Sequence, residues 1–218
     1  MKTIIFDLDG TILDTLVDLK KAVNHALKFY NLPQKSLEFV RLAIGNGTTV
    51  LIKRCTPETL SEEKRRQVFA LFKSYYLAHY ADNTRPYEGI KEMLISLKPY
   101  ARLAVVSNKD DDLTKRLIEK EFPGLFDIVQ GSYLDKPKKP DSYLLNKIIA
   151  SSCLLRDECL YIGDTDVDKM TATNASLPYL LVNYGYRTKA ELEKMCPDDT
   201  TISDIPTLYN KILKWVNS

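Results

Sequence analysis

Short apolar runs alternate with amphipathic stretches along most of this chain. Four of these runs are typical of buried strands: residues 3–6, 102–106, 159–162 and 179–182. A weaker run at 126–129 is predicted as a fifth strand. Helical periodicity separates these runs, at 90–97, 112–121, 143–151 and, last, 206–216. Strands that alternate with helices in this way predict an α/β fold built on a parallel sheet.

The period changes directly after the first strand. Apolar residues recur at helical spacing over residues 16–30 and again over 68–79, and no strand pattern interrupts this segment. We therefore predict an all-helical cap domain, residues 15–83, inserted into a core made of residues 1–14 and 84–218. The core is predicted to be a Rossmann-like parallel sheet with helices on both faces.

Composition narrows the class of protein. The chain has 218 residues, 44% of them hydrophobic, and a net charge of +2 whose basic residues are spread along the sequence. This distribution argues against a nucleic-acid or membrane partner. The four cysteines have no paired spacing, no apolar run approaches the ~20 residues that span a bilayer, and no signal peptide is recognisable. We expect a cytoplasmic protein, and its oligomeric state stays open.

Candidate chemistry begins where the first strand ends. Asp7 and Asp9 follow the run 3–6 and stand beside Gly10, which allows a sharp turn. The carboxyl ends of strands in a parallel sheet are where ligands bind. Two carboxylates there would repel each other by about 4 kcal/mol at roughly 4 Å and an effective dielectric constant near 20, so a cation is implied. The plain alternative is a turn with a helix cap.

A second candidate lies at the end of the run 102–106. Ser107 and Asn108 offer a hydroxyl and an amide there, together with backbone donors. Such groups suit a phosphate oxygen. An ordinary strand-to-helix loop is the alternative for these two residues.

A third candidate follows the run 159–162. Acids occupy positions 164, 166 and 168, but Lys169 and Ala175 stand where a calcium-binding EF-hand needs glycine and glutamate. An EF-hand is therefore excluded. Asp164 is the better metal ligand because it follows the strand directly, and Asp168 is expected to fix a lysine or a metal-bound water.

A lysine is required near these carboxylates if a phosphate is to enter. Lys136, Lys138 and Lys139 lie in one short run with two prolines. A divalent cation and one lysine would together compensate three carboxylates. The residue pattern alone does not choose among the three lysines.

These segments together resemble a known family. The chain is similar to the haloacid dehalogenase superfamily in four motifs, in the expected order: Asp7-Leu8-Asp9-Gly10-Thr11, Ser107-Asn108, a Lys-Pro step, and Gly163-Asp164 followed by Asp168. The helical insert resembles that superfamily's first type of cap. In the phosphoglycolate phosphatase relatives, the lysine stands before a proline and about 25 residues before the aspartate of the last motif. Both Lys136 and Lys139 precede a proline, and the spacing favours Lys139, with Lys136 as the fallback. Ser142 departs from the second proline that these relatives often carry.

The resemblance implies a mechanism and a set of roles. Asp7 would be the nucleophile that forms an aspartyl-phosphate, and Asp9 the general acid and then base. Mg²⁺ would be held by Asp7, Asp164 and the backbone carbonyl of Asp9. The remaining roles concern phosphate binding, for which the expected residues are Thr11, Ser107, Asn108 and Lys139.

The resemblance also implies a substrate class. We expect a small phosphorylated metabolite, phosphoglycolate-like, to be hydrolysed as a phosphomonoester. The alternatives are a sugar phosphomutase of the same superfamily and, further off, a pyrophosphatase or a nucleotidase. In the cap, Ile44-Gly45-Asn46-Gly47 resembles the phosphoglycolate phosphatase relatives, so Gly45, Asn46 and Gly47 are expected to form a substrate loop. A plain turn between two cap helices is the other interpretation of those three residues.

Overall fold

The computed structural model describes residues 1–218, and these fall into two compact units. One unit joins residues 1–13 to residues 86–218, and the other is residues 14–85. The sequence placed the two boundaries after residues 14 and 83, one and two residues from these positions. The roles of catalytic core and cap that were attached to the units stay predictions.

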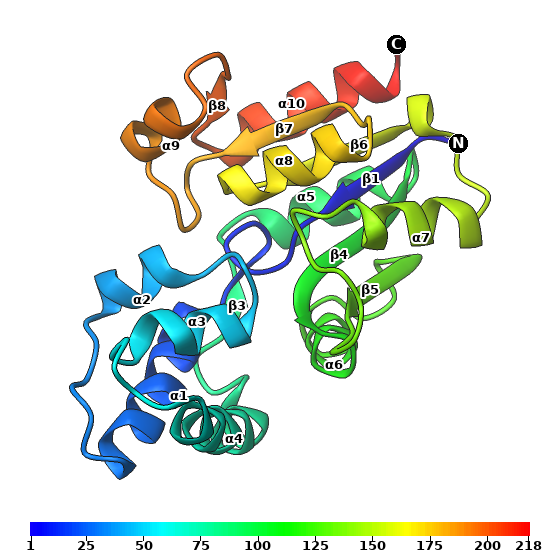
Figure 1. The fold of residues 1–218 in the computed structure, drawn as a ribbon. Coiled ribbons are helices and arrows are strands. Elements are labelled where there is room, and N and C mark those ends of the chain that lie inside the picture. The colour runs from blue at the N-terminus through cyan, green and yellow to red at the C-terminus, as the bar shows by residue number, and fades with distance from the viewer. The chain divides into compact units, whose positions relative to one another are not determined.

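The larger unit, residues 1–13 and 86–218, is built on a six-stranded parallel sheet (Figure 1). Its strand order is β5-β4-β1-β6-β7-β8. The bounds are β1 Thr3–Phe6, β4 Arg102–Asp110, β5 Ile128–Ser132, β6 Cys159–Gly163, β7 Tyr179–Val182 and β8 Thr201–Ile202. The predicted α/β fold is confirmed. The two-residue strand β8 was not predicted, because two residues are too short to show a periodicity.

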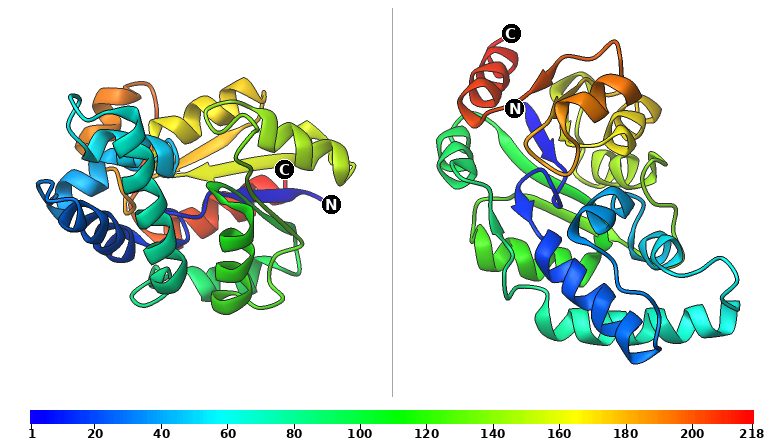
Figure 2. Two further views of the ribbon diagram at one scale, coloured as in Figure 1. Left: turned by 60° about the horizontal axis from the view of Figure 1, so that its bottom comes forward. Right: turned by 90° about the vertical axis from the view of Figure 1, so that its left-hand side faces the viewer.

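Helices cover both faces of this sheet, as Figures 1 and 2 show. One face carries α5, Ile90–Leu97, α6, Asp111–Glu121, and α10, Ile205–Val216; the other carries α7, Tyr143–Ser151, and α8, Asp166–Asn174. The remaining helical elements are the single 3₁₀ turn Arg156–Glu158 and α9, Lys189–Met195. Buried apolar side chains of α7 and α8 pack against β1, β4 and β6, which gives the sheet a continuous core.

Strand β4 runs further than its apolar run. The apolar positions end at Val106, but the strand continues to Asp110, and its register against β5 shifts between these two residues. A hydrophobicity pattern does not detect this extension, because its residues are polar. Ser107, Asn108 and Lys109 are nevertheless all buried. The weaker predicted strand is also displaced, from 126–129 to 128–132.

The smaller unit, residues 14–85, holds four helices. These are α1, Leu16–Phe29, α2, Leu37–Ala43, α3, Thr48–Cys55, and α4, Glu62–His79. Helices α1 and α4 pack together through buried apolar residues at helical spacing, as their periodicity predicted. No bounds were predicted for α2 and α3, which are seven and eight residues long.

A buried carboxylate, that of Asp18, connects the first helix of the smaller unit to the last residues of that unit. Asp18 on α1 accepts hydrogen bonds from the backbone N–H groups of Asn83 and Thr84, each at 2.8 Å. It also accepts one from the Asn83 amide and one from the Thr84 hydroxyl, at 2.7 and 3.0 Å. The start of the unit is thereby joined to its end. The chain passes between the units in β2, Leu13–Asp14, and β3, Arg85–Pro86, which pair as a two-stranded sheet.

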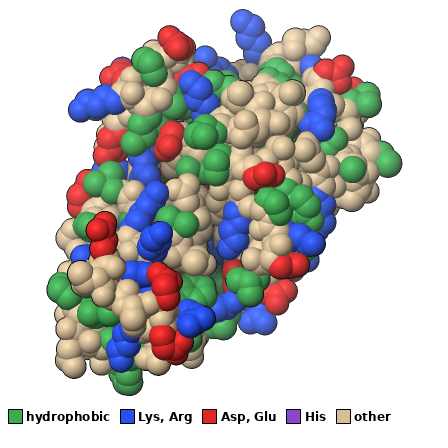
Figure 3. Space-filling view, viewed as in Figure 1, with side chains coloured by type: hydrophobic (Ala, Val, Ile, Leu, Met, Phe, Trp, Pro, Cys, Tyr) green, Lys and Arg blue, Asp and Glu red, His purple; other side chains and the backbone are tan.

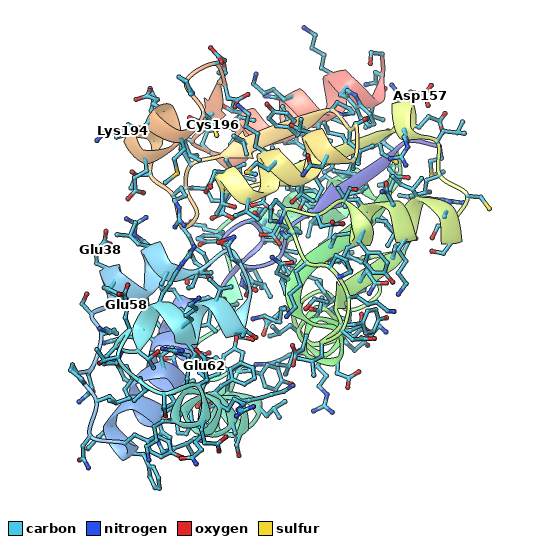
Figure 4. The ribbon with its side chains drawn as sticks, viewed as in Figure 1. Glu38, Glu58, Glu62, Asp157, Lys194 and Cys196 are labelled. Atoms are coloured by element: carbon cyan, nitrogen blue, oxygen red, sulfur yellow. The ribbon has the colours of Figure 1, made fainter.

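Charges of both signs lie on the face that Figure 3 draws. On the face drawn in Figure 3, Lys and Arg side chains are interspersed with Asp and Glu side chains. Some of these charges form pairs along one helix: Glu38, labelled in Figure 4, lies 2.6 Å from Arg41 on α2. No helix of the structure combines the length and the hydrophobicity that crossing a membrane requires.

Candidate active site

Three buried carboxylates meet at the carboxyl edge of the sheet. Asp7 directly follows β1 and Asp164 directly follows β6, the strand hydrogen-bonded to it, and the Asp7 N–H donates to the Ile162 carbonyl at 2.8 Å. One oxygen from each of Asp7, Asp164 and Asp168 lies within 4.8 Å of the others. Parallel pairing brings the two strand ends to the same edge, which explains how residues 157 positions apart become neighbours.

A glycine allows the first strand to turn against Asp164. Gly10 has a φ of +91°, in the left-handed region that favours glycine. A Cβ at this position would lie 2.3 Å from Oδ2 of Asp164. Next to it, the buried Thr11 hydroxyl donates to Oδ1 of Asp164 at 3.3 Å. The contact of Thr11 with a phosphate stays a prediction.

Of the lysine run, Lys139 lies in this site. Its Nζ is 2.6 Å from Oδ1 of Asp7 and 2.7 Å from Oδ1 of Asp168, and its side chain is 3% exposed. Lys136 instead pairs with Asp135 and is 47% exposed. Burial by itself lowers the pKa of Lys139, but the charges of Asp168 and Asp7 outweigh it and hold that pKa well above its usual value. Lys139 is therefore an ammonium group.

Asp168 is held by donors on both of its oxygens. Oδ1 accepts from Lys139 Nζ and from the Tyr161 hydroxyl at 3.0 Å, and Oδ2 accepts from the Thr165 hydroxyl at 2.7 Å. Burial raises its pKa, but the Lys139 charge and these hydrogen bonds bring the pKa below its usual value. This arrangement supports the expected role of Asp168 in fixing a lysine.

Tyr161 was missed by the sequence analysis. Its ring is fully buried in β6, and its hydroxyl accepts a hydrogen bond from Lys139 Nζ at 3.1 Å while donating to Asp168. Burial and the charge of Asp168 raise its pKa well above the usual value, so the hydroxyl keeps its proton. The available signal was a single tyrosine inside an apolar strand.

The residues after Val106 hold the lysine loop. The Asn108 side chain donates to the Lys139 carbonyl at 3.0 Å and accepts from the Lys139 N–H at 2.7 Å. Its amide thus fixes the backbone that carries Lys139. Ser107 is buried, and its hydroxyl accepts from the Lys109 N–H at 3.2 Å. Phosphate binding by Ser107 and Asn108 stays a prediction.

Asp9, the expected acid and base, has its own lysine. The Nζ of Lys109 lies 3.0 Å from Oδ1 of Asp9. Sequence reasoning did not select Lys109, although a lysine directly after Ser-Asn at a strand end is a usable signal. The predicted metal contact of the Asp9 carbonyl stays a prediction.

The loop that follows β7 was also missed by the sequence analysis. The Tyr186 N–H donates to Oδ2 of Asp164 at 2.6 Å, and the Tyr184 hydroxyl donates to the Thr11 carbonyl at 3.1 Å. Between these tyrosines, a Cβ on Gly185 would lie 2.0 Å from the carbonyl oxygen of Gly10. The loop therefore supports both the Asp7–Thr11 turn and Asp164. The sequence signal that could have identified this loop is a glycine between two tyrosines directly after a strand.

The charge balance of the site fits a divalent cation. Burial, and next to it the charge of Asp168, raise the pKa of Asp7 to about 7 even though Lys139 opposes the shift. Burial and the same neighbour raise the pKa of Asp164 well above its usual value. Four carboxylates, those of Asp7, Asp9, Asp164 and Asp168, face two ammonium groups, which leaves two negative charges when all are ionised. Carboxylate oxygens are the ligands that a hard divalent ion prefers.

The expected substrate loop lies in the smaller unit, between α2 and α3. Gly45 and Gly47 both have positive φ angles, +122° and +82°. Arg54 holds this turn, because its guanidinium donates to the Ala43 carbonyl at 2.9 Å and to Oδ1 of Asn46 at 2.8 Å. Sequence reasoning did not name Arg54. Contact of Gly45, Asn46 and Gly47 with a substrate stays a prediction.

Comparison with known proteins agrees with the motifs. The profile of the family described as haloacid dehalogenase-like hydrolase matches residues 4–182. A phosphoglycolate phosphatase of Caulobacter vibrioides is 34% identical over 201 residues, covering 90% of this chain and 84% of its own. A phosphoglycolate phosphatase of Vibrio cholerae is 32% identical over 222 residues, covering 98% of this chain and 97% of its own.

Solved structures give the same result for the fold. A crystal structure from Lactobacillus delbrueckii subsp. bulgaricus is 31% identical to this chain and superposes with a TM-score of 0.89, covering 97% of this chain and 99% of that one. A predicted phosphoglycolate phosphatase from Haemophilus somnus is 29% identical, with a TM-score of 0.84 and coverage of 98% and 97%.

Proposed function

This chain belongs to the haloacid dehalogenase-like hydrolases and is a phosphoric monoester hydrolase, and we propose that it hydrolyses a small phosphomonoester through an aspartyl-phosphate on Asp7. The observation that carries the proposal is the placement of the Asp7 carboxylate. It stands at the end of β1, 2.6 Å from Lys139 Nζ and within 4.8 Å of a carboxylate oxygen of Asp164, and Asp9 lies two residues further along the chain.

In the first step, an oxygen of Asp7 attacks phosphorus while the bond from phosphorus to the ester oxygen breaks. The departing oxygen keeps the electron pair of that bond and takes a proton from the Asp9 carboxyl group, which releases an alcohol. Lys139 stabilises the charge that spreads over the phosphoryl oxygens, since its ammonium group already contacts Asp7.

In the second step, water attacks phosphorus and gives its proton to the Asp9 carboxylate. The bond between phosphorus and Asp7 breaks, inorganic phosphate leaves, and both aspartates return to their starting state. The hydrogen bonds that hold Lys139 and Asp168 keep these groups fixed through both steps.

Mg²⁺ is the divalent ion that we propose for this site. Asp7 and Asp164 would hold it with their carboxylates, while both oxygens of Asp168 are occupied by Lys139, Tyr161 and Thr165. When bound, Mg²⁺ neutralises phosphate charge and aligns the phosphoryl group for in-line displacement.

For the substrate, we propose 2-phosphoglycolate or a close relative. Support comes from the curated relatives that carry the name phosphoglycolate phosphatase and align over most of this chain. A phosphomutase would use the same aspartyl-phosphate but return the phosphoryl group to a sugar.

The test is phosphate release over a panel of phosphorylated metabolites, with Mg²⁺ and with a chelator. The wild type should release inorganic phosphate from 2-phosphoglycolate only when Mg²⁺ is present. Asp7→Asn should reduce this rate by at least about 10³-fold, because an amide cannot form the intermediate. Asp135→Asn is the matched control, since Asp135 is 76% exposed and pairs only with the exposed Lys136.

Two results would contradict the proposal. If Asp7→Asn turns the substrate over as fast as the wild type does, Asp7 is not the nucleophile. If the phosphoryl group is transferred to a sugar phosphate and no inorganic phosphate is released, the protein is a phosphomutase.

A further inference from the structure

Lys109 is a buried lysine that the motifs of the site do not include. Its side chain is 3% exposed, and its Nζ lies 3.0 Å from Oδ1 of Asp9. A buried ammonium group is costly unless a charge of opposite sign compensates it. Asp9 supplies that charge, so each of the two aspartates that flank Leu8 has its own lysine: Lys139 for Asp7 and Lys109 for Asp9.

The backbone of Lys109 is fixed from three sides. Its N–H donates to the Ser107 hydroxyl at 3.2 Å, and its carbonyl lies 3.3 Å from the Thr114 hydroxyl, whose proton it shares with the Asp110 carbonyl at 3.0 Å. On the neighbouring strand β5, Gly131 approaches so closely that a Cβ there would lie 2.7 Å from the Lys109 carbonyl oxygen. The place from which the Lys109 side chain extends is therefore set by the α/β unit itself.

The same region is where β4 departs from regular pairing. Its register against β5 shifts between Val106 and Asp110, and Lys109 lies inside this irregular segment. Such irregularities change the direction of a side chain at a strand end. Here the outcome is an ammonium group that lies 3.0 Å from the Asp9 carboxylate.

We propose that Lys109 is a positioning residue for Asp9: its ammonium group, 3.0 Å from Oδ1, holds that oxygen and so leaves the other oxygen of the Asp9 carboxyl group in the orientation that serves the leaving group. The inference rests on the proposed function, because it assigns Asp9 to proton transfer. In the proposed first step, the proton moves from the carboxyl group of Asp9 to the ester oxygen, and Lys109 takes no part in the bond changes. An alternative role, direct binding of phosphate by Lys109, predicts different kinetics.

Leaving-group dependence distinguishes the two roles. An alkoxide is a poor leaving group and needs the acid, whereas p-nitrophenolate leaves without a proton. Loss of positioning should therefore slow an alkyl phosphate and spare p-nitrophenyl phosphate. Loss of a phosphate contact should weaken both substrates alike, because both carry the same phosphate.

The experiment compares Lys109→Met and Lys109→Gln with the wild type on p-nitrophenyl phosphate and on the alkyl phosphate that the wild type turns over fastest. For the alkyl phosphate, we expect kcat to fall about 30-fold, with KM changed less than about threefold. For p-nitrophenyl phosphate, kcat should fall less than about threefold. The glutamine variant keeps a polar group of similar length and replaces the methionine variant if the latter does not fold, as thermal unfolding will show.

A double-mutant cycle adds an independent readout. If Lys109 acts through Asp9, then adding Lys109→Met to Asp9→Asn should slow the alkyl phosphate by less than about twofold more. Lys115→Met is the control, because Lys115 also pairs with an aspartate, Asp111 at 2.6 Å, but is 56% exposed on α6. It should match the wild type on both substrates.

Equal losses on both substrates, a rise confined to KM, or full additivity with Asp9→Asn would each overturn the positioning role while leaving the phosphatase proposal intact. If the wild type hydrolyses none of the phosphomonoesters, the proposed function fails and the role of Lys109 fails with it.

Discussion

Replacing Asp18 should destabilise the contact between the start and the end of the helical unit, more strongly with alanine than with asparagine. Asp18 is buried and accepts four hydrogen bonds from Asn83 and Thr84, two of them from backbone N–H groups. Asp18→Ala leaves these donors without an acceptor. A lost hydrogen bond that strands a buried donor costs about 1–3 kcal/mol. For the two backbone groups together, we expect a loss of about 3–4 kcal/mol in the free energy of opening this end of the unit.

Asp18→Asn tests the contribution of the negative charge, because asparagine has nearly the same shape as aspartate but is neutral. Asparagine keeps one oxygen that can accept from the backbone N–H groups of Asn83 and Thr84, but it loses the negative charge that strengthens these bonds. Charge-assisted hydrogen bonds are about twice as strong as neutral ones, so we expect a smaller loss of about 1–2 kcal/mol.

The assay is hydrogen exchange of the Asn83 and Thr84 amides under native conditions. A loss of about 3 kcal/mol corresponds to exchange roughly a hundredfold faster in Asp18→Ala, and the asparagine variant should lie between it and the wild type. Glu38→Gln is the control, because the Glu38 side chain is 64% exposed and its pair with Arg41 should contribute less than about 1 kcal/mol.

The pH dependence gives a second check on Asp18. Burial alone would raise its pKa, but the hydrogen bonds from Asn83 and Thr84 outweigh burial and the pKa lies below the usual value of 3.8. The stabilisation is therefore fully present above pH 3.8 and is lost as the pH falls through the lowered pKa. The difference between wild type and Asp18→Asn should shrink only in that acidic range. Equal exchange rates in the wild type and Asp18→Ala would refute the reasoning.

Three further predictions concern the candidate active site. Tyr161→Phe removes the hydroxyl between Lys139 and Asp168, so kcat for phosphate release should fall about tenfold, and an unchanged kcat would show that the hydroxyl is dispensable. Gly185→Ala forces a Cβ to within 2.0 Å of the Gly10 carbonyl oxygen, so the turn must shift; we expect a destabilisation of about 2–4 kcal/mol in urea unfolding, and wild-type stability and activity together would contradict the close approach. Folding raises the pKa of Asp7 from 3.8 to about 7, so with a chelator present its ionisation should lower stability as the pH rises between these values. Added Mg²⁺ should therefore raise Tm more at pH 8 than at pH 5, and an equal rise at both pH values would argue against this carboxylate as its ligand.

The sequence alone predicted the parts of the fold that follow from local periodicity. Alternation of apolar strands and amphipathic helices predicted the α/β sheet, and the helical spacing that begins at residue 16 predicted a helical segment over residues 15–83. Asp7 and Asp164 could also be found, because each directly follows an apolar strand and parallel strands bring such positions to one edge.

The lysines show where local signals end. The residue pattern left Lys136, Lys138 and Lys139 equivalent, and the family resemblance favoured Lys139 before any contact was known. The structure places the Lys139 ammonium 2.6 Å from Asp7, across 132 positions of sequence. Lys109 gave no periodic signal at all, because it lies in a polar extension of β4 that a hydrophobicity pattern does not report as strand.

Tyr161 and Gly185 required the tertiary structure for the same reason. A tyrosine inside a strand is compatible with ordinary packing, and a glycine in a loop is compatible with an ordinary turn. Their meaning comes from the neighbours that the sheet brings to them, which are Lys139 and Asp168 in one case and the Gly10 carbonyl in the other. Periodicity determines which residues are buried and in which kind of element. Only the packed strands determine which polar groups meet, because burial makes each unpaired charge or donor costly and so selects its partner from distant parts of the chain.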